Sequence, residues 1–206
     1  MASIYSLKPG FQRMLRPLVK RLARMGVSAN QITIAAIILS LGAGLLIACL
    51  RRSSALLVLP PVLLVRMALN AMDGMLAREH HQQSATGAVL NELGDVVSDV
   101  GLYLPLALIP GFGIWPVAAI VILSVLSEMT GAVGAGIGGS RRYDGPLGKS
   151  DRAFVFGLMG LLLGLGKHIE GAIPAVLLAM IVLLACTIAN RMRHILLEAS
   201  STGSAQ

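Results

Sequence analysis

Six long apolar stretches, separated by short polar segments, constrain this chain more than any other feature. They cover about residues 32–50, 55–78, 87–110, 114–136, 153–165 and 172–188. A helix of about 20 apolar residues crosses the hydrocarbon core of a bilayer, and a helix satisfies its own backbone hydrogen bonds there. The pattern therefore predicts an all-α, polytopic membrane protein with six transmembrane helices.

The composition agrees with this prediction and argues against other classes of protein. Hydrophobic residues make up 55% of the chain and charged residues 13%, whereas a soluble domain carries about 25% charged residues. A net charge of +7 would also suit a nucleic-acid-binding protein. However, the basic residues lie between the apolar stretches, where headgroups and topology account for them. We therefore expect membrane lipids, and no nucleic acid, as partners.

The chain divides into three predicted parts. Residues 1–26 form an N-terminal segment whose residues 8–25 are amphipathic but too charged to span, so they are predicted to lie on the headgroup surface. Residues 27–197 form the six-helix domain, with Ser28 or Asn30 as the N-cap of the first span. Residues 198–206 form a flexible tail.

The distribution of basic residues predicts the orientation in the membrane. Most of them fall in the N-terminal segment and in the segments that follow the second, fourth and sixth stretches. Only Arg51, Arg52 and Lys167 fall on the other side. The positive-inside rule then places the N-terminus in the cytoplasm. We expect a multi-pass protein of the cell inner membrane.

Ionisable side chains are concentrated in the second and third stretches. An Arg or Asp at a helix centre costs about 2.5–3.5 kcal/mol on insertion scales, so such residues usually face a cavity or one another. At helical spacing, one polar face holds Arg66, Asn70 and Asp73, and another holds Asn91, Glu92, Asp95 and Asp99. Carboxylate and amide oxygens from two helices suit hard cations such as Mg²⁺ or Mn²⁺.

Other polar or reactive residues have simpler explanations. Cys49 and Cys186 lie inside apolar stretches without metal-site spacing, so they are expected to pack in the protein. His80 and His81 fall in a short connecting segment and are expected to face solvent or headgroups. Glu128 lies inside the fourth stretch, where it lines a pocket, pairs with Arg66 or another base, or contributes to subunit packing.

The polar residues belong to a longer motif. Its members are Asp73, Gly74, Ala77, Arg78, Gly87, Asn91 and Asp95. Eight residues separate Arg78 from Gly87, and three residues separate Gly87 from Asn91 and Asn91 from Asp95. This spacing resembles the signature of the CDP-alcohol phosphotransferase family, D-x2-D-G-x2-A-R-x8-G-x3-D-x3-D. The family has six transmembrane helices behind an amphipathic helix, so the resemblance covers nearly the whole chain.

The resemblance implies an enzyme of phospholipid biosynthesis. It would transfer a phosphatidyl group from a CDP-diacylglycerol-type lipid to a small alcohol, release CMP and act as a homodimer at the cytoplasmic face. It implies a pair of Mg²⁺ or Mn²⁺ ions on Asn70, Asp73, Asn91 and Asp95, with Asp95 as general base. It places the nucleotide against Gly74, Ala77, Arg78 and Gly87, and the acceptor or a phosphate against Lys149 and Arg152.

Several of these residues also have structural explanations. Small residues such as Gly74, Ala77 and Gly87 also allow helices to pack closely. Lys149 and Arg152 are equally well explained as cytoplasmic topology charges.

Two motif positions depart from the family pattern. Asn70 and Asn91 stand where the family has aspartates, which removes two negative charges from the metal site. Since two divalent cations repel each other, we expect one tightly bound metal, or metals that bind only with nucleotide. Supporting residues are Glu92 and Asp99, which would restore charge, and Arg66. Arg66 would neutralise Asp95 or Glu92, bind a lipid phosphate or form a structural salt bridge.

Two alternatives to an enzyme fit parts of the sequence. The first is a catalytically weakened membrane protein that binds a CDP-lipid or regulates another process, because the two asparagines reduce the charge that holds metal. The second is a small transporter, which the composition allows. No inverted hydropathy repeat supports the transporter.

Overall fold

The computed structural model describes residues 8–137 and 142–203, and over these residues the protein is all-α, without a β-strand. Its helices are α1 (Lys8–Arg24), α2 (Ala29–Leu50), α3 (Leu59–Glu79), α4 (Ala85–Tyr103), α5 (Ile114–Gly136), α6 (Lys149–Gly164) and α7 (Ile173–Gly203). Short 3-10 helices join them at η2 (Ser53–Val58), η3 (Leu104–Leu108) and η4 (Glu170–Ala172). The predicted tail at 198–206 begins inside α7, and residues 204–206 lie outside the described residues.

Four of the described helical segments are long and apolar enough to cross a membrane. They are Ala29–Leu50, Ser53–Glu79, Ile114–Gly136 and Glu170–Glu198. The other two predicted spans correspond to α4, which carries three acidic residues, and to α6, which has 16 residues. Length and composition thus confirm four of the six predicted spans, and the assignment of α4 and α6 depends on their surroundings.

The helix ends follow from local sequence. Ser28 caps α2: its side chain accepts a hydrogen bond from the Gln31 backbone N–H at 3.2 Å, and the Gln31 side chain accepts one from the Ser28 backbone N–H at 2.9 Å. This reciprocal capping box satisfies two backbone donors that the helix leaves free. Ser84 caps α4 in a similar way through the Gly87 backbone N–H. Of the two predicted caps for the first span, Ser28 is the one observed.

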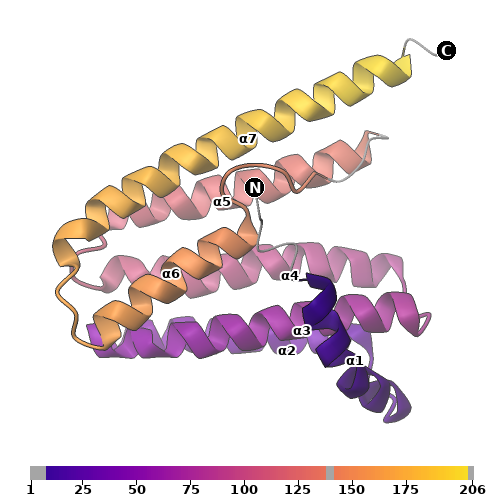
Figure 1. Ribbon diagram of the computed structural model, residues 1–206, viewed down its shortest axis with the longest axis horizontal. Helices are drawn as coiled ribbons and strands as arrows, with labels where there is room; N and C mark the ends of the chain where they lie inside the picture. The colour runs from indigo at the N-terminus through magenta and orange to yellow at the C-terminus, as the bar shows by residue number, and fades with distance from the viewer. Residues whose placement is uncertain (1–7, 138–141, 204–206) are drawn as a thin grey trace.

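The helices form two groups (Figure 1). Helix α2 packs against α3 and α4, whereas α5 packs against α7. Helix α6 packs on α3 and on η2, and α1 crosses α3 near the end of α3. Helices α3 and α4, which carry the polar motif, are therefore covered by neighbours on several sides.

The contact between α2 and α4 depends on two glycines. A Cβ atom added to Gly44 would lie 1.9 Å from the backbone oxygen of Gly101, and one added to Gly101 would lie 2.3 Å from Leu41 Cδ2. Small residues allow helix backbones to approach closely in membranes. This approach fixes the position of α4 beside α2.

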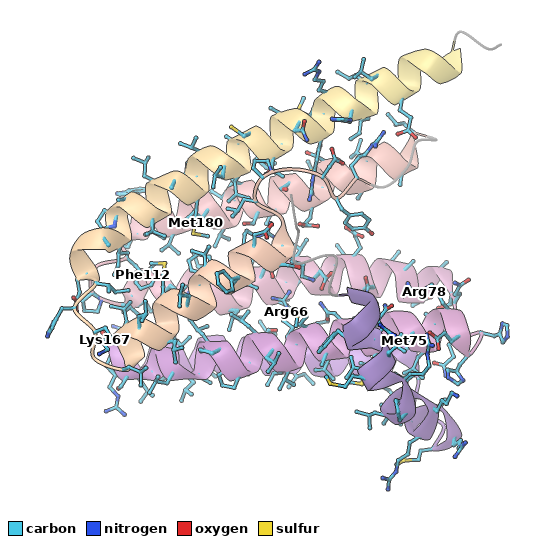
Figure 2. All side chains as sticks on the ribbon, viewed as in Figure 1. Arg66, Met75, Arg78, Phe112, Lys167 and Met180 are labelled. Carbon is cyan, nitrogen blue, oxygen red and sulfur yellow. The ribbon has the colours of Figure 1, made fainter. Side chains whose placement is uncertain are left out.

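Two apolar clusters lie on either side of the polar residues. The smaller joins α1 to α2 and α3 through Leu15, Val19, Ile32, Met75 and Leu76. The larger lies toward the other end and includes Leu56, Leu102, Phe112, Phe156 and Leu177. Figure 2 shows Met75 beside α1, Phe112 and Lys167 at the opposite end, and Arg66 between them. The polar residues of α3 and α4 therefore lie in the interval between two apolar cores.

Candidate active site

Four motif residues meet between α3 and α4. Asn70 Nδ2 donates a hydrogen bond to Asp95 Oδ1 at 2.9 Å, and Asn91 Nδ2 donates one to Asp73 Oδ2 at 3.1 Å. Each helix contributes one amide and one carboxylate, because spacings of three and four residues place side chains on one helix face. The structure thus brings together the four residues predicted from the sequence as metal ligands.

Asp73 is held at the centre of three helices. Its side chain is buried, with 3% exposed, and its Oδ2 also accepts a hydrogen bond from Thr33 Oγ1 of α2 at 2.9 Å. Its Oδ1 is buried and has no hydrogen-bond partner among the described residues. A buried carboxylate oxygen without a donor is costly, so its environment favours a bound cation.

Asp95 is engaged by cations of the chain itself. The ammonium group of Lys149, the first residue of α6, forms an ion pair with Asp95 Oδ1, the same oxygen that accepts from Asn70. Arg66 lies 3.8 Å from this oxygen and donates to the Asp95 backbone oxygen at 3.1 Å. The Asp95 and Lys149 side chains are 24% and 29% exposed. This carboxylate therefore faces a partly open space rather than the core.

A cavity of about 710 Å³ opens beside Asp73. Its size lies within the range of about 300–1,000 Å³ found for small-molecule sites. Among the predicted site residues, those that line it are Asn70, Asp73, Gly74, Ala77, Arg78, Gly87, Asn91 and Glu92. The predicted nucleotide-binding residues and three of the four predicted metal ligands thus share one cavity, and Asp95 lies just beyond its lining.

Three other predicted residues belong to a buried charge network. Arg66 pairs with Asp99 at 2.6 Å, Asp99 with Arg152 at 2.8 Å, Arg152 with Glu128 at 3.4 Å, and Glu128 with Arg191 at 3.9 Å. We refer to these five residues as the buried ion network. Arg152 has 0% exposed surface and two carboxylate partners, so the structure gives it internal contacts rather than the exposed position of a topology charge.

The network also answers two questions left open by the sequence. Arg66 pairs with Asp99 and lies near Asp95, so its structural salt bridge is observed. Glu128 pairs with arginines of α6 and α7 rather than with Arg66.

Sequence reasoning missed several residues of the site. The cavity lining includes Asn30 and Thr33 of α2 and Tyr143 of the segment before α6. The first two are polar and three residues apart at the start of an otherwise apolar stretch, a spacing that marks one helix face and would have indicated them. No sequence pattern points to Tyr143.

The segment that precedes Lys149 is held by α7. Thr187 Oγ1 accepts a hydrogen bond from the Leu147 backbone N–H at 3.0 Å, and Asn190 Nδ2 donates to Asp144 Oδ2 at 3.3 Å. Gly145 has φ +139°, and a Cβ added there would lie 2.4 Å from Thr187 Cγ2. These contacts fix the start of α6 and therefore the position of Lys149 over Asp95.

The oxygen donors fit one divalent cation better than two. No group of three or more His, Cys, Asp or Glu side chains suited to a metal is found among the described residues. Asp73 lies beside a polar cavity, and its buried Oδ1 has no hydrogen-bond partner within residues 8–137 and 142–203, so it fits a single hard cation. At Asp95, the Lys149 ammonium already contacts the carboxylate oxygen that faces Asn70.

Comparisons with known proteins agree with the motif. The model of the family described as CDP-alcohol phosphatidyltransferase matches residues 26–200. The inner membrane protein YnbA of Escherichia coli strain K12 is 49% identical over 159 residues, which cover 77% of this chain and 79% of that protein. With the apolar helices, this similarity identifies the chain as a membrane protein.

Solved structures show the same fold. Phosphatidylinositol phosphate synthase PgsA1 of Mycobacterium tuberculosis with CDP-DAG bound has a TM-score of 0.75 and 20% identity, covering 89% of this chain and 94% of that chain. The same enzyme with manganese and citrate has a TM-score of 0.73 and 20% identity, covering 87% of both chains. At this identity the likeness concerns the fold.

Proposed function

Because the chain belongs to the CDP-alcohol phosphatidyltransferase family, we propose that it transfers a phosphatidyl group from a CDP-linked lipid to an alcohol hydroxyl and releases CMP. The observation that carries this proposal is the convergence of the motif residues of α3 and α4 on one polar cavity. Binding of CDP-DAG by the related synthase supports a CDP-lipid donor.

In the proposed membrane arrangement, residues 27–197 form six spans, with α4 and α6 as the two that composition alone does not identify. The acidic residues of α4 support this, because Asp95 and Asp99 pair with basic residues of neighbouring helices. Paired charges that face the protein interior are the form in which spans tolerate ionisable residues. The N-terminus, α1 and the cavity lie on the cytoplasmic side, and two chains form a homodimer.

The donor's CDP group occupies the cavity, against Gly74, Ala77 and Gly87, while its acyl chains remain in the bilayer between helices. Arg78 is exposed at the cavity edge and supplies a guanidinium group for phosphate. A divalent cation, Mg²⁺ or Mn²⁺, held by Asp73 together with Asn91 would neutralise charge on the pyrophosphate. Manganese in the related synthase supports a divalent metal.

Asp95 is the proposed general base. Its carboxylate accepts the proton of the alcohol hydroxyl as the alcohol oxygen attacks the β-phosphorus of the donor, and the bond from this phosphorus to CMP breaks. Asn70 orients the carboxylate through its hydrogen bond. Lys149 supplies positive charge where negative charge develops on the phosphoryl oxygens.

The test is CMP release by the purified chain in lipid with Mg²⁺ or Mn²⁺, CDP-diacylglycerol and a pooled set of small alcohols. We expect metal-dependent CMP together with a lipid product whose mass identifies the alcohol. Omission of the alcohols is the control, because hydrolysis of the donor also gives CMP but yields no new phosphodiester lipid.

A second candidate function is a CDP-lipid-binding protein that has lost turnover. The observation that favours it is the engagement of Asp95 Oδ1 by both Lys149 and Asn70, because these contacts compete with an alcohol hydroxyl for the same oxygen. Saturable binding of CDP-diacylglycerol without CMP release from any alcohol in the pool would establish this alternative.

A further inference from the structure

The centre between α3 and α4 contains an unusual balance of charges. Two of its four motif side chains are carboxylates and two are amides, and each amide N–H is hydrogen-bonded to a carboxylate of the facing helix. The ammonium group of Lys149 is in contact with one of these carboxylates. One of the two negative charges is therefore already paired with a positive charge of the chain.

The carboxylates of Asp73 and Asp95 differ in the oxygen atoms that they leave available to a ligand. Asp73 is buried, and its Oδ1 has no hydrogen-bond partner among the described residues. At Asp95, the Oδ1 atom is shared by Lys149 and Asn70, and Arg66 lies 3.8 Å away. A divalent cation on Asp95 would be repelled by the positive charges of Lys149 and Arg66. A divalent cation on Asp73 would be coordinated by the Oδ1 atom described above.

We propose that Lys149 is a built-in cation of this centre: it occupies the Asp95 half permanently and leaves the Asp73 half for one divalent ion. The proposal deepens the proposed function and rests on it for the identity of the centre. In this proposal the ammonium group of Lys149 binds the Asp95 carboxylate in place of a second metal ion. This role is additional to any contact that Lys149 makes with a substrate phosphate.

The fold holds Lys149 in this position. It is the first residue of α6, and Asp151 caps that helix by accepting a hydrogen bond from the Gly148 backbone N–H at 2.9 Å. The preceding segment is tied to α7 through Leu147 and Thr187 at 3.0 Å. The N-terminus of α6 is thus fixed both by Asp151 within the helix and by Thr187 of α7. A mobile surface lysine would not require these two contacts.

The test measures Mn²⁺ binding by calorimetry on the full chain in lipid nanodiscs without nucleotide. We expect the natural chain to bind one Mn²⁺. In the Asn70→Asp background, which restores one carboxylate, we expect Lys149→Met to tighten binding of a second Mn²⁺ by about tenfold, because one like charge leaves the neighbourhood of a dication. The matched control is Lys167→Met in the same background, since Lys167 is exposed at the opposite end of the molecule (Figure 2).

Two results would overturn the proposal: two Mn²⁺ ions bound by the natural chain, or equal second-site affinity in the Lys149 and Lys167 variants. Lys149→Gln replaces Lys149→Met if the methionine variant is not monodisperse. CMP release is measured separately. A chain that releases CMP but binds two ions contradicts only this inference, whereas a chain with the expected metal binding but no CMP release contradicts only the proposed function.

Discussion

The candidate active site and the buried ion network both use side chains of α3 and α4, but they differ in their surroundings. In the network, Arg66 and Asp99 are enclosed, and each charge has an opposite charge within reach. In the site, Asp73 has an oxygen without a hydrogen-bond partner in the described part of the chain, and Asp95 is partly exposed. The contrast teaches that a charged side chain between apolar helices does not by itself indicate function. Charges that satisfy one another connect helices, and charges that face a cavity remain available for ligands.

The largest effect is expected from breaking the network. Arg152→Met leaves the carboxylates of Asp99 and Glu128 buried without their shared partner. Removal of one member of a buried pair costs about 3–5 kcal/mol of unfolding free energy. Steric-trap unfolding in bicelles measures this loss. The control is Arg16→Met, whose exposed pair with Glu79 at 2.9 Å is worth less than about 1 kcal/mol. Equal losses of unfolding free energy in the two variants would show that the network stabilises the protein no more than an exposed ion pair does.

Asp95→Asn tests the candidate active site. It removes the proposed base but keeps the size of the side chain, so we expect CMP release to fall by about a hundredfold or more. Unfolding free energy should change little. Glu79→Gln is the matched control, because it makes the same chemical change at an exposed position. Unchanged turnover in the Asp95 variant would remove Asp95 from the mechanism.

Gly44→Ala tests whether the site depends on the close approach of α2 and α4. The added methyl group would collide with the Gly101 backbone oxygen at 1.9 Å, and overpacking of this kind costs about 1–3 kcal/mol. Gly42→Ala in the same helix is the control, since nothing lies within 4 Å of its added Cβ. Thermal unfolding measures both. A Gly44 variant as stable as the control would indicate that the helices separate readily.

The smallest effect is expected at Thr33, which orients Asp73 from α2. Thr33→Val removes the hydroxyl that donates to Asp73 Oδ2. Loss of a hydrogen bond to a metal-binding side chain weakens metal binding by about tenfold or more. Mn²⁺ titration measures this change. Thr130→Val is the control, because among the described residues the Thr130 hydroxyl bonds to the Leu126 backbone oxygen of its own helix. Equal affinities in the two variants would contradict a role for Thr33.

Much of the fold could be predicted because its signals are local. Apolar length and helical period depend on residues that are neighbours along the chain, and they predicted α5 with the bounds that the structure shows. The motif likewise placed Asp73 and Asn70 on one face of α3. The meeting of these residues with Asn91 and Asp95 followed from adjacent helices joined by a short turn.

The ion-pair partners of the basic residues in α6 could not be predicted from such local signals. Lys149 and Arg152 are three residues apart on one helix, yet the first contacts Asp95 of the candidate active site and the second belongs to the buried ion network. Their sequence context is the same, so the packing of α6 on α3 and η2 separates them. Hydrophobicity and helical period therefore suffice to identify four segments that can cross a membrane and the helix faces that are polar. Which opposite charges meet depends on contacts between helices distant in the chain, because ion pairing acts over a few ångströms in space rather than along the sequence.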